Sequence, residues 1–290
     1  MDEGEFVEAD DSSIGGGGPA IIPCNWLQHF ENVVDPYHVP VLHGSFSGPQ
    51  FTNMMASVPE VTFEMSPRGV TVRAIRNQDD GKVFYRITEA ALPTLRVVPN
   101  PRVAQFARVE SIGWTLPIDD VSFRIYVVGR VKRSGDIGRM RSKFNGKFWW
   151  DMTEEEHQRF PGDYEAQVGQ GPLTIHSEEH FGQSDRGILM IRRMLGDQLE
   201  ALAAGRDPIG VWFDDNAPPV AFEAGNYIRE AKAGLGAGPD LTPARVHLGP
   251  RSPGSWSGRT CGRWRLRCSW TSNLLARLSA GLPSASTTRP

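Results

Sequence analysis

The chain has 290 residues, of which 39% are hydrophobic, and its formal net charge at pH 7 is -3. This length and apolar content allow one large hydrophobic core or two small ones. Because the charge is near neutral, the chain offers no electrostatic surface for nucleic acid. The composition therefore favours an enzyme that acts on small molecules.

The N-terminal region is acidic and lacks the positive charge and the apolar stretch of a secretion signal. No run approaches the roughly 18 apolar residues that a membrane span requires. The cysteines Cys24, Cys261 and Cys268 are an odd number without framework spacing, as in a reducing compartment. We therefore expect a cytoplasmic protein without membrane contact, in which residues 1–20 are a flexible acidic and Gly-rich lead-in.

An amphipathic helix is predicted to run up to His38. Its polar positions recur at spacings of three and four, so they share one side of the helix. A polar stripe that faces the interior costs free energy unless a site requires it. The apolar side is formed by Trp26, Phe30, Val33 and Val34, and the polar side by Glu31, Asn32, Asp35 and His38.

His38 and His43 are five positions apart, a step that turns the second side chain away from the first on a continuous α-helix. Pro40 lacks the N–H that the helical ladder needs and pushes Val39 out of the helical region. We therefore expect the helix to end just after His38, so that the two imidazoles can meet there. The pair alone is weak evidence for a metal site, because most histidines on helices are structural.

The middle of the chain predicts an antiparallel sheet. Hydrophobic runs that alternate with polar residues and are separated by turn signals lie at residues 61–65, 70–75, 83–88, 109–116 and 121–131. Charged and aromatic residues on one side of such a sheet more often mark a solvated face than a binding site. We therefore assign none of them to a substrate.

Two later segments carry residues that could bind a metal. Asp163 follows Pro161 and Gly162 and opens a new helix, where an aspartate can be an N-cap or a ligand. His176 and His180 have the spacing of a zinc-protease helix. Ser177 stands where that motif requires a glutamate, so we interpret these two histidines as structural or pocket-lining.

The strongest predicted helix follows, from Ser184 as its N-cap to Gly205 and Pro208 at its end. From about residue 233 onward the chain is rich in Gly, Pro, Ser and Arg without periodicity. We expect residues 233–290 to be a disordered tail. The apolar stripe of the helix is formed by Ile188, Ile191, Leu195, Leu199 and Leu202.

The pattern Asn25-Trp26, Glu31-Asn32 and Asp35-x-x-His38-x4-His43 resembles the iron-binding motif of the alpha subunit of Rieske-type non-haem iron oxygenases. Residues 179–187 are similar to a segment of the phthalate-dioxygenase-like and aromatic O-demethylase branch. The resemblance implies an α+β helix-grip (START-like) catalytic domain, a curved antiparallel sheet packed against a long C-terminal helix.

The same resemblance implies the site. His38 and His43 would bind ferrous iron, and Asp163, preferred over Glu165, would be the third ligand. Such a triad leaves iron positions open for oxygen and substrate. Asp35 would link His38 to an electron donor, and Asn32 is a weaker candidate for a supporting hydrogen bond.

A Rieske 2Fe-2S cluster needs Cys-x-His and Cys-x-x-His pairs, and the sequence contains neither. We therefore expect residues 21–232 to be a mononuclear-iron catalytic domain that lacks the N-terminal Rieske domain. Its electrons would come from a ferredoxin, a reductase or a Rieske-bearing subunit. The family also implies a possible homotrimer.

The expected activity is that of an aromatic-ring dioxygenase or a monooxygenase. With O2 at Fe(II), it would hydroxylate or O-demethylate an aromatic carboxylic acid. The alternative is a truncated, non-catalytic helix-grip remnant that binds iron or an apolar ligand without turnover.

Overall fold

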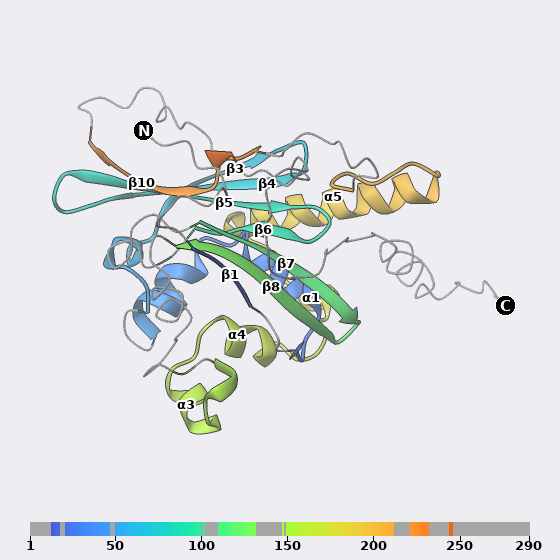
Figure 1. Ribbon diagram of the computed structural model, residues 1–290, viewed down its shortest axis with the longest axis horizontal. Helices are drawn as coiled ribbons and strands as arrows, with labels where there is room; N and C mark the ends of the chain where they lie inside the picture. Colours follow the sequence, from blue (N-terminus) through green and yellow to red (C-terminus); the bar gives the residue numbers. More distant parts are fainter. Residues whose placement is uncertain are drawn as a thin grey trace, which may run out of the picture.

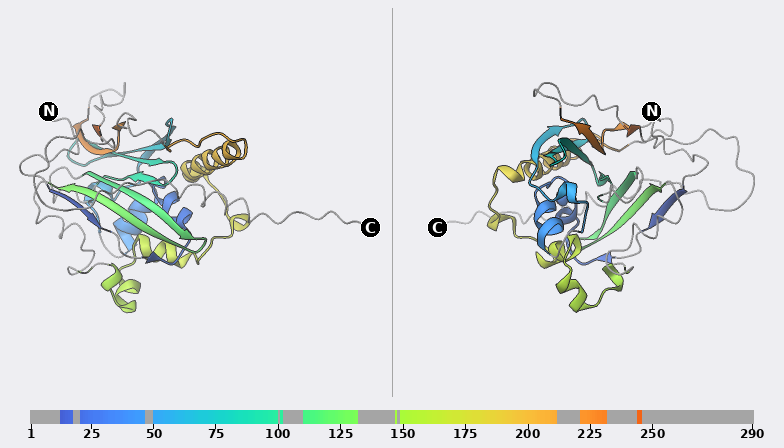
Figure 2. Two further views of the ribbon diagram at one scale, coloured as in Figure 1. Left: turned by 45° about the vertical axis from the view of Figure 1, so that its right-hand side comes forward. Right: turned by 90° about the vertical axis from the view of Figure 1, so that its left-hand side faces the viewer.

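The computed structural model describes residues 13–17, 21–46, 50–99, 101, 110–131, 147, 149–211, 221–231 and 244–245. These residues form an α+β fold in which one antiparallel sheet of nine strands curves around helices (Figures 1 and 2). The expected fold class is confirmed. None of the described helices is long and apolar enough to cross a membrane.

The sheet has the order β1-β8-β7-β6-β5-β4-β3, with β2 also paired to β8 and β10 also paired to β5. A separate pair joins β9 (Ala221–Phe222) to β11 (Ala244–Arg245). The strands of the large sheet are β1 (Ser13–Gly17), β2 (Ile21–Ile22), β3 (Glu60–Met65), β4 (Gly69–Asn77), β5 (Lys82–Ala91), β6 (Leu95–Val97), β7 (Glu110–Asp119), β8 (Ser122–Val131) and β10 (Gly225–Glu230).

The helical elements lie between strands along the chain. The α-helices are α1 (Trp26–Asn32), α3 (Glu154–Arg159), α4 (Asp163–Gly169) and α5 (Arg186–Ala203). A π-helix, η1 (Val39–Phe46), follows α1, and short 3-10 turns occupy Asn53–Met55, Trp149–Asp151, His176–Glu178 and Gln183–Asp185.

Two long strands each pair with two short ones along a single edge. β5 pairs with β10 along its first half and with β6 along its last three residues. β8 likewise pairs with β1 and with β2. Ser13–Gly17, which we expected to be flexible, therefore form a strand, because backbone pairing does not depend on side chains.

All five strands predicted from alternation are present, as β3, β4, β5, β7 and β8. β6 and β10 were not predicted. β6 has three residues, which is too short to show a period of two, and β10 joins the sheet only after α5, beside a strand that lies far earlier in the sequence. The expected helix α5 is therefore not the last element of the fold.

The main core lies between the sheet and two helices. Val70 and Val72 of β4 contact Phe30 of α1 and Ile191 and Met194 of α5, and all five side chains are buried. Figure 1 shows α1 and α5 on the same side of the sheet. Burial of a large apolar side chain contributes about 1.5–3 kcal/mol, so this contact is a principal source of stability.

Helix α5 begins differently from our expectation. Its N-cap is Asp185, not Ser184, and the Asp185 carboxylate accepts a hydrogen bond from the Gly182 N–H at 2.7 Å. The predicted apolar stripe is correct for the first part of the helix, where Ile191 is fully buried. Leu199, nearer the end, is exposed.

Gly187 in the first turn of α5 permits its close contact with α1 and β3. A Cβ atom at this position would lie 2.6 Å from the Val34 carbonyl oxygen and 2.7 Å from the Phe63 ring. Gly196 lies further along the same helix, and a Cβ atom there would meet nothing within 4 Å. The two glycines therefore form a matched pair.

We predict that Gly187→Ala lowers the free energy of unfolding by about 1–3 kcal/mol, because the methyl group forces α5 away from its neighbours. Gly196→Ala should raise it by about 0.5–1 kcal/mol through helix propensity alone. Urea unfolding of both variants measures the difference. Equal effects of the two substitutions would contradict the close packing at Gly187.

Candidate metal site

Helix α1 ends earlier than its polar stripe predicts. Its last residue is Asn32, six positions before His38. Pro36 explains the early end, because a proline disfavours the helical conformation of the residue before it, here Asp35. The expectation that the helix continues to His38 and ends at Pro40 is therefore wrong.

The turn that brings the two histidines together is the π-helix η1. Pro40 is its second residue, in the first turn, where a missing N–H costs no helical hydrogen bond. The i→i+5 hydrogen bonds of a π-helix place residues five apart on the same side. The rings of His38 and His43 accordingly lie 5.4 Å apart between centroids, with 74° between their planes.

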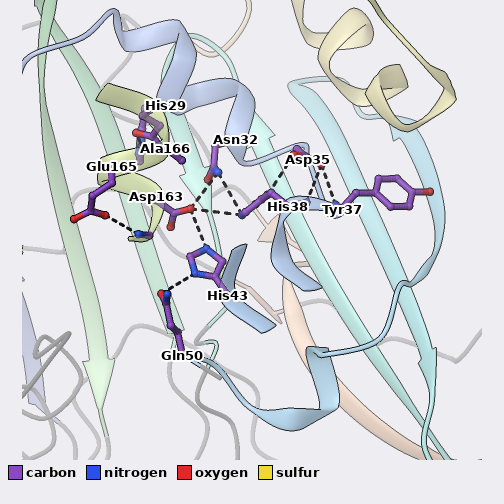
Figure 3. Close-up of polar contacts among 12 residues, drawn as sticks. His29, Asn32, Asp35, Tyr37, His38, His43, Gln50, Asp163, Glu165 and Ala166 are labelled. Atoms are coloured by element: carbon purple, nitrogen blue, oxygen red, sulfur yellow. Dashed lines mark hydrogen bonds and ion pairs between the residues drawn. The ribbon is translucent and has the colours of Figure 1, made fainter. Parts of the chain in front are cut away.

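Asp163 completes a group of three side chains (Figure 3). One potential ligand atom from each of His38, His43 and Asp163 lies within 4.8 Å of the others. Asp163 Oδ1 is 3.0 Å from His43 Nε2 and 3.6 Å from His38 Nε2. The structure thus brings together the three residues that the sequence comparison with the oxygenase motif selected.

Asp163 is the first residue of α4, and its carboxylate does not cap that helix. Gly162 is the N-cap, and the Gly162 N–H donates to Glu165 Oε2 at 2.6 Å. Glu165 also pairs with His157. Glu165 is therefore occupied at the start of α4, while Asp163 points toward the two histidines.

Each imidazole has a side-chain oxygen near its outer nitrogen, within ion-pair distance at His38 and in a hydrogen bond at His43. His38 Nδ1 lies 3.4 Å from Asp35 Oδ2, and His43 Nδ1 lies 3.1 Å from Gln50 Oε1. A proton held on each Nδ1 leaves the Nε2 lone pair free, and both Nε2 atoms face Asp163. Sequence reasoning missed Gln50, because no spacing pattern connects a lone glutamine to His43.

Asn32 lies between two members of the group. Its Nδ2 is 3.3 Å from His38 Nε2 and donates to Asp163 Oδ1 at 3.3 Å. The expected supporting position of Asn32 agrees with this contact. Asp35 in turn accepts hydrogen bonds from the N–H groups of Tyr37 and His38, which orients its carboxylate toward the His38 ring.

Apolar packing holds His43 in place. The Phe51 ring stacks on it at 4.0 Å between centroids, and only 3% of His43 is exposed. Val39, Met55 and Phe84 form a buried cluster beside this stack. The imidazole therefore has little freedom to rotate.

Neighbouring side chains shift the pKa values of Asp163 and His38. Burial alone raises the pKa of the Asp163 carboxyl, but the charge and hydrogen bond of His43 and the charge of His38 outweigh it and hold that pKa well below its ordinary value. Burial lowers the pKa of His38, whereas Asp35 and Asp163 raise it more strongly. Asp163 is thus an ionised carboxylate, which attracts positive charge.

Two other candidate groups lie outside the site. Glu31, which we expected on the same polar stripe as Asn32, instead binds Arg192 of α5, with Oε2 2.8 Å from Nη2. Arg192 also binds Glu179. His176 and His180 belong to no cluster of potential metal ligands within the described residues.

His29 lies one turn before Asn32 on α1 and is buried between this helix and the sheet. Its ring stacks on Phe123 at 5.1 Å, and its Nδ1 contacts Gln167 Oε1 of α4 at 3.0 Å. Burial, and then the charge of Arg96, lower the pKa of His29 to about 3. His29 is therefore neutral at physiological pH and joins α1 to the helix that carries Asp163.

The chain resembles oxygenase subunits. It is 37% identical over 235 residues, 78% of this chain and 56% of the relative, to the phenoxybenzoate dioxygenase subunit alpha of Ectopseudomonas oleovorans. It is 30% identical over 226 residues, 66% of this chain and 46% of the relative, to the tert-butanol monooxygenase / tert-amyl alcohol desaturase oxygenase subunit of Aquincola tertiaricarbonis. The chain thus spans about half the length of these relatives.

A solved structure of a Pseudomonas putida CBB5 NdmA mutant with theobromine matches 68% of this chain and 53% of that one, with a TM-score of 0.44 and 14% identity. No family model matches the sequence.

An α+β domain that gathers two imidazoles and one carboxylate has the donor set of mononuclear non-haem iron proteins. The chain is a homologue of the catalytic domain of Rieske-type oxygenase alpha subunits. The resemblance inferred from the sequence is thereby confirmed.

We predict that His29 makes the free energy of unfolding depend on pH. Its folded pKa of about 3 lies below its ordinary value of 6.5, so the stabilising neutral form is complete above pH 6.5 and lost as the pH falls. The loss approaches about 1.4 kcal/mol per pH unit. His29→Gln should remove this part of the slope in urea unfolding between about pH 7 and pH 5.

The matched control is His180→Gln, because His180 is exposed. This variant should keep the slope of the unmodified chain. If the free energy of unfolding of His29→Gln falls with decreasing pH as steeply as that of the unmodified chain, the conclusion that buried His29 is neutral is wrong.

Proposed function

We propose that this chain is the catalytic component of an oxygenase that holds Fe(II) at His38, His43 and Asp163 and hydroxylates or O-demethylates an aromatic carboxylic acid. The observation that carries the proposal is the orientation of the two imidazoles. Gln50 forms a hydrogen bond with the outer nitrogen of His43, Asp35 lies 3.4 Å from that of His38, and both inner nitrogens face the carboxylate of Asp163.

This donor set fits ferrous iron. Two imidazole nitrogens and one carboxylate oxygen suit iron, and three protein donors leave open positions for oxygen and substrate. When bound, the iron would supply the activation of O2. The separation of the donor atoms, within 4.8 Å of one another, is small enough for one ion to contact all three.

The surrounding residues orient the donors. Gln50 Oε1 accepts a hydrogen bond from His43 Nδ1, and its Nε2 donates to the Pro161 carbonyl oxygen at 2.7 Å, so Gln50 joins η1 to the segment before Asp163. Asn32 donates to Asp163 Oδ1 and limits which carboxylate lone pairs face the metal. Such outer contacts raise ligand basicity and fix the tautomer.

Asp35 is proposed to have a second role. Its carboxylate lies beside His38 Nδ1, and about 29% of its side chain is exposed. An electron-donor protein that docks at this surface could therefore reach the metal through Asp35 and His38. A ferredoxin, a reductase or the Rieske domain of another subunit, as in a homotrimer, would be the partner.

We predict that Asp163→Ala abolishes stoichiometric Fe(II) binding, because two imidazoles alone hold the ion weakly. Glu165→Gln removes a neighbouring carboxylate that contacts His157 and Gly162, so it should bind iron as the unmodified chain does. Anaerobic equilibrium dialysis followed by metal analysis measures both variants. Full iron occupancy in Asp163→Ala would overturn the assignment of the third ligand.

Catalysis needs a separate test. The iron-loaded chain, supplied with peroxide and aromatic acids, should release hydroxylated or demethylated product. Iron binding without any product would instead support a non-catalytic remnant.

We predict that Asp35→Asn at saturating iron lowers turnover driven by an electron-donor protein at least tenfold, in line with the effect of outer contacts at other metal sites, about 10–100-fold. Peroxide-driven turnover, which needs no electron donor, should fall much less. Asp80→Asn, an exposed hairpin substitution, is the control. Equal losses in both assays would show that Asp35 has only a structural role.

A further inference from the structure

Three arginines extend from the face of the sheet that the helices cover. In an antiparallel pair, residues directly opposite each other share a face. Arg76 lies opposite Phe84, and Arg96 lies opposite Ala90. Arg86, between Phe84 and Ala90 at spacings of two and four, is on the same face. Phe84 contacts the cluster beside His43, and Ala90 contacts the core around α1.

These arginines are poorly paired. Arg76 and Arg86 are 2% and 7% exposed, and each donates one hydrogen bond to a neutral group, the Ser57 carbonyl at 2.8 Å and Asn226 Oδ1 at 3.1 Å. The Nε atom of Arg96 is buried without a hydrogen-bond partner. Within the described residues, no ion pair links any of the three to a carboxylate.

The acids that share this interior are already engaged. Asp163 contacts His38 and His43, Asp35 contacts His38, and Glu31 binds Arg192. Burial lowers the pKa of Arg86 to about 9 and that of Arg96 to about 10, and the Asp163 carboxylate opposes both shifts. Phe84, two positions before Arg86 on the same face of β5, packs in the cluster beside His43, so Arg86 lies on the side of the sheet that carries the metal group. Buried cations without a counter-charge are costly.

The sheet leaves room for the Arg96 side chain. Gly113 of β7 lies opposite Arg96, and a Cβ atom at this position would lie 2.9 Å from Arg96 Nε. The guanidinium group thus lies directly over the backbone of β7. Any larger residue at position 113 would push it aside.

We propose that Arg96, together with Arg86, binds the carboxylate of an aromatic acid substrate and so selects acids over neutral aromatic compounds. The proposal rests on the oxygenase function proposed above. A guanidinium group donates two parallel hydrogen bonds to a carboxylate and retains its charge when buried. Such an anion would provide the counter-charge that the described residues do not supply.

The test compares 3-methoxybenzoate with 3-methoxybenzamide, which has nearly the same shape without the charge. Calorimetric titration of the full chain, with and without Fe(II), should show the acid binding about 10–100-fold more tightly. Arg96→Gln should remove this preference while leaving the binding of the amide unchanged. Arg96→Lys should restore part of it, because a lysine keeps the charge but not the paired hydrogen bonds.

Arg73→Gln is the matched control. Arg73 belongs to the same strand as Arg76 but to the opposite face, where it pairs with Glu64 and Glu223. This variant should keep the preference for the acid. Circular dichroism and thermal unfolding check that each variant is folded, and the comparison of acid and amide in the unmodified chain needs no variant.

Equal binding of acid and amide by the unmodified chain would overturn the proposal. So would an unchanged preference in folded Arg96→Gln, or acetate binding as tightly as the aromatic acid. Iron binding in the same samples separates the two proposals. Normal iron binding without a preference for the acid contradicts only the role of the arginines, whereas loss of iron binding in the unmodified chain contradicts the oxygenase function.

Discussion

The hydrogen bonds between α1 and the segment of α4 hold the whole candidate site together. Gln28 Nε2 donates to the carbonyl oxygens of Gln167 and Gly171, both at 3.1 Å, and the Asn25 N–H donates to the Pro172 carbonyl at 2.9 Å. These contacts join segments about 140 residues apart in sequence. Together with the contacts of Asn32, Gln50 and His29, they fix the position of Asp163 relative to the two histidines.

The cost of assembling the site follows from this arrangement. His38 and His43 are brought together by one local turn, whereas Asp163 lies beyond the intervening sheet in sequence. The entropy of closing such a long loop grows only slowly with its length, so a few buried contacts can offset it. Phe30 of α1 and Val34, just after this helix, are fully or almost fully buried and supply such contacts on the sheet side.

Local patterns in the sequence predicted much of the fold and part of the site. Alternation revealed the five longer strands, and the two histidines were found from their spacing, although Pro36 and a π-helix, not Pro40, determine how they meet. Asp163 could be selected only through the resemblance to a family, because a single aspartate at a helix start is equally well a cap. Gln50 could not be found because no spacing pattern connects it to His43, and Arg96 could not because its position depends on which face of the sheet the helices cover.

That covered face also relates the metal to the arginines. A divalent ion at His38, His43 and Asp163 would carry the same sign of charge as Arg86 and Arg96, and like charges in a medium of low dielectric repel strongly. Asp163 offsets only part of this charge. An anionic substrate between the two would be attracted to both, so metal and substrate would each bind more tightly in the presence of the other. A neutral substrate would gain nothing from this coupling, and selectivity for acids would therefore be greatest in the iron-loaded chain.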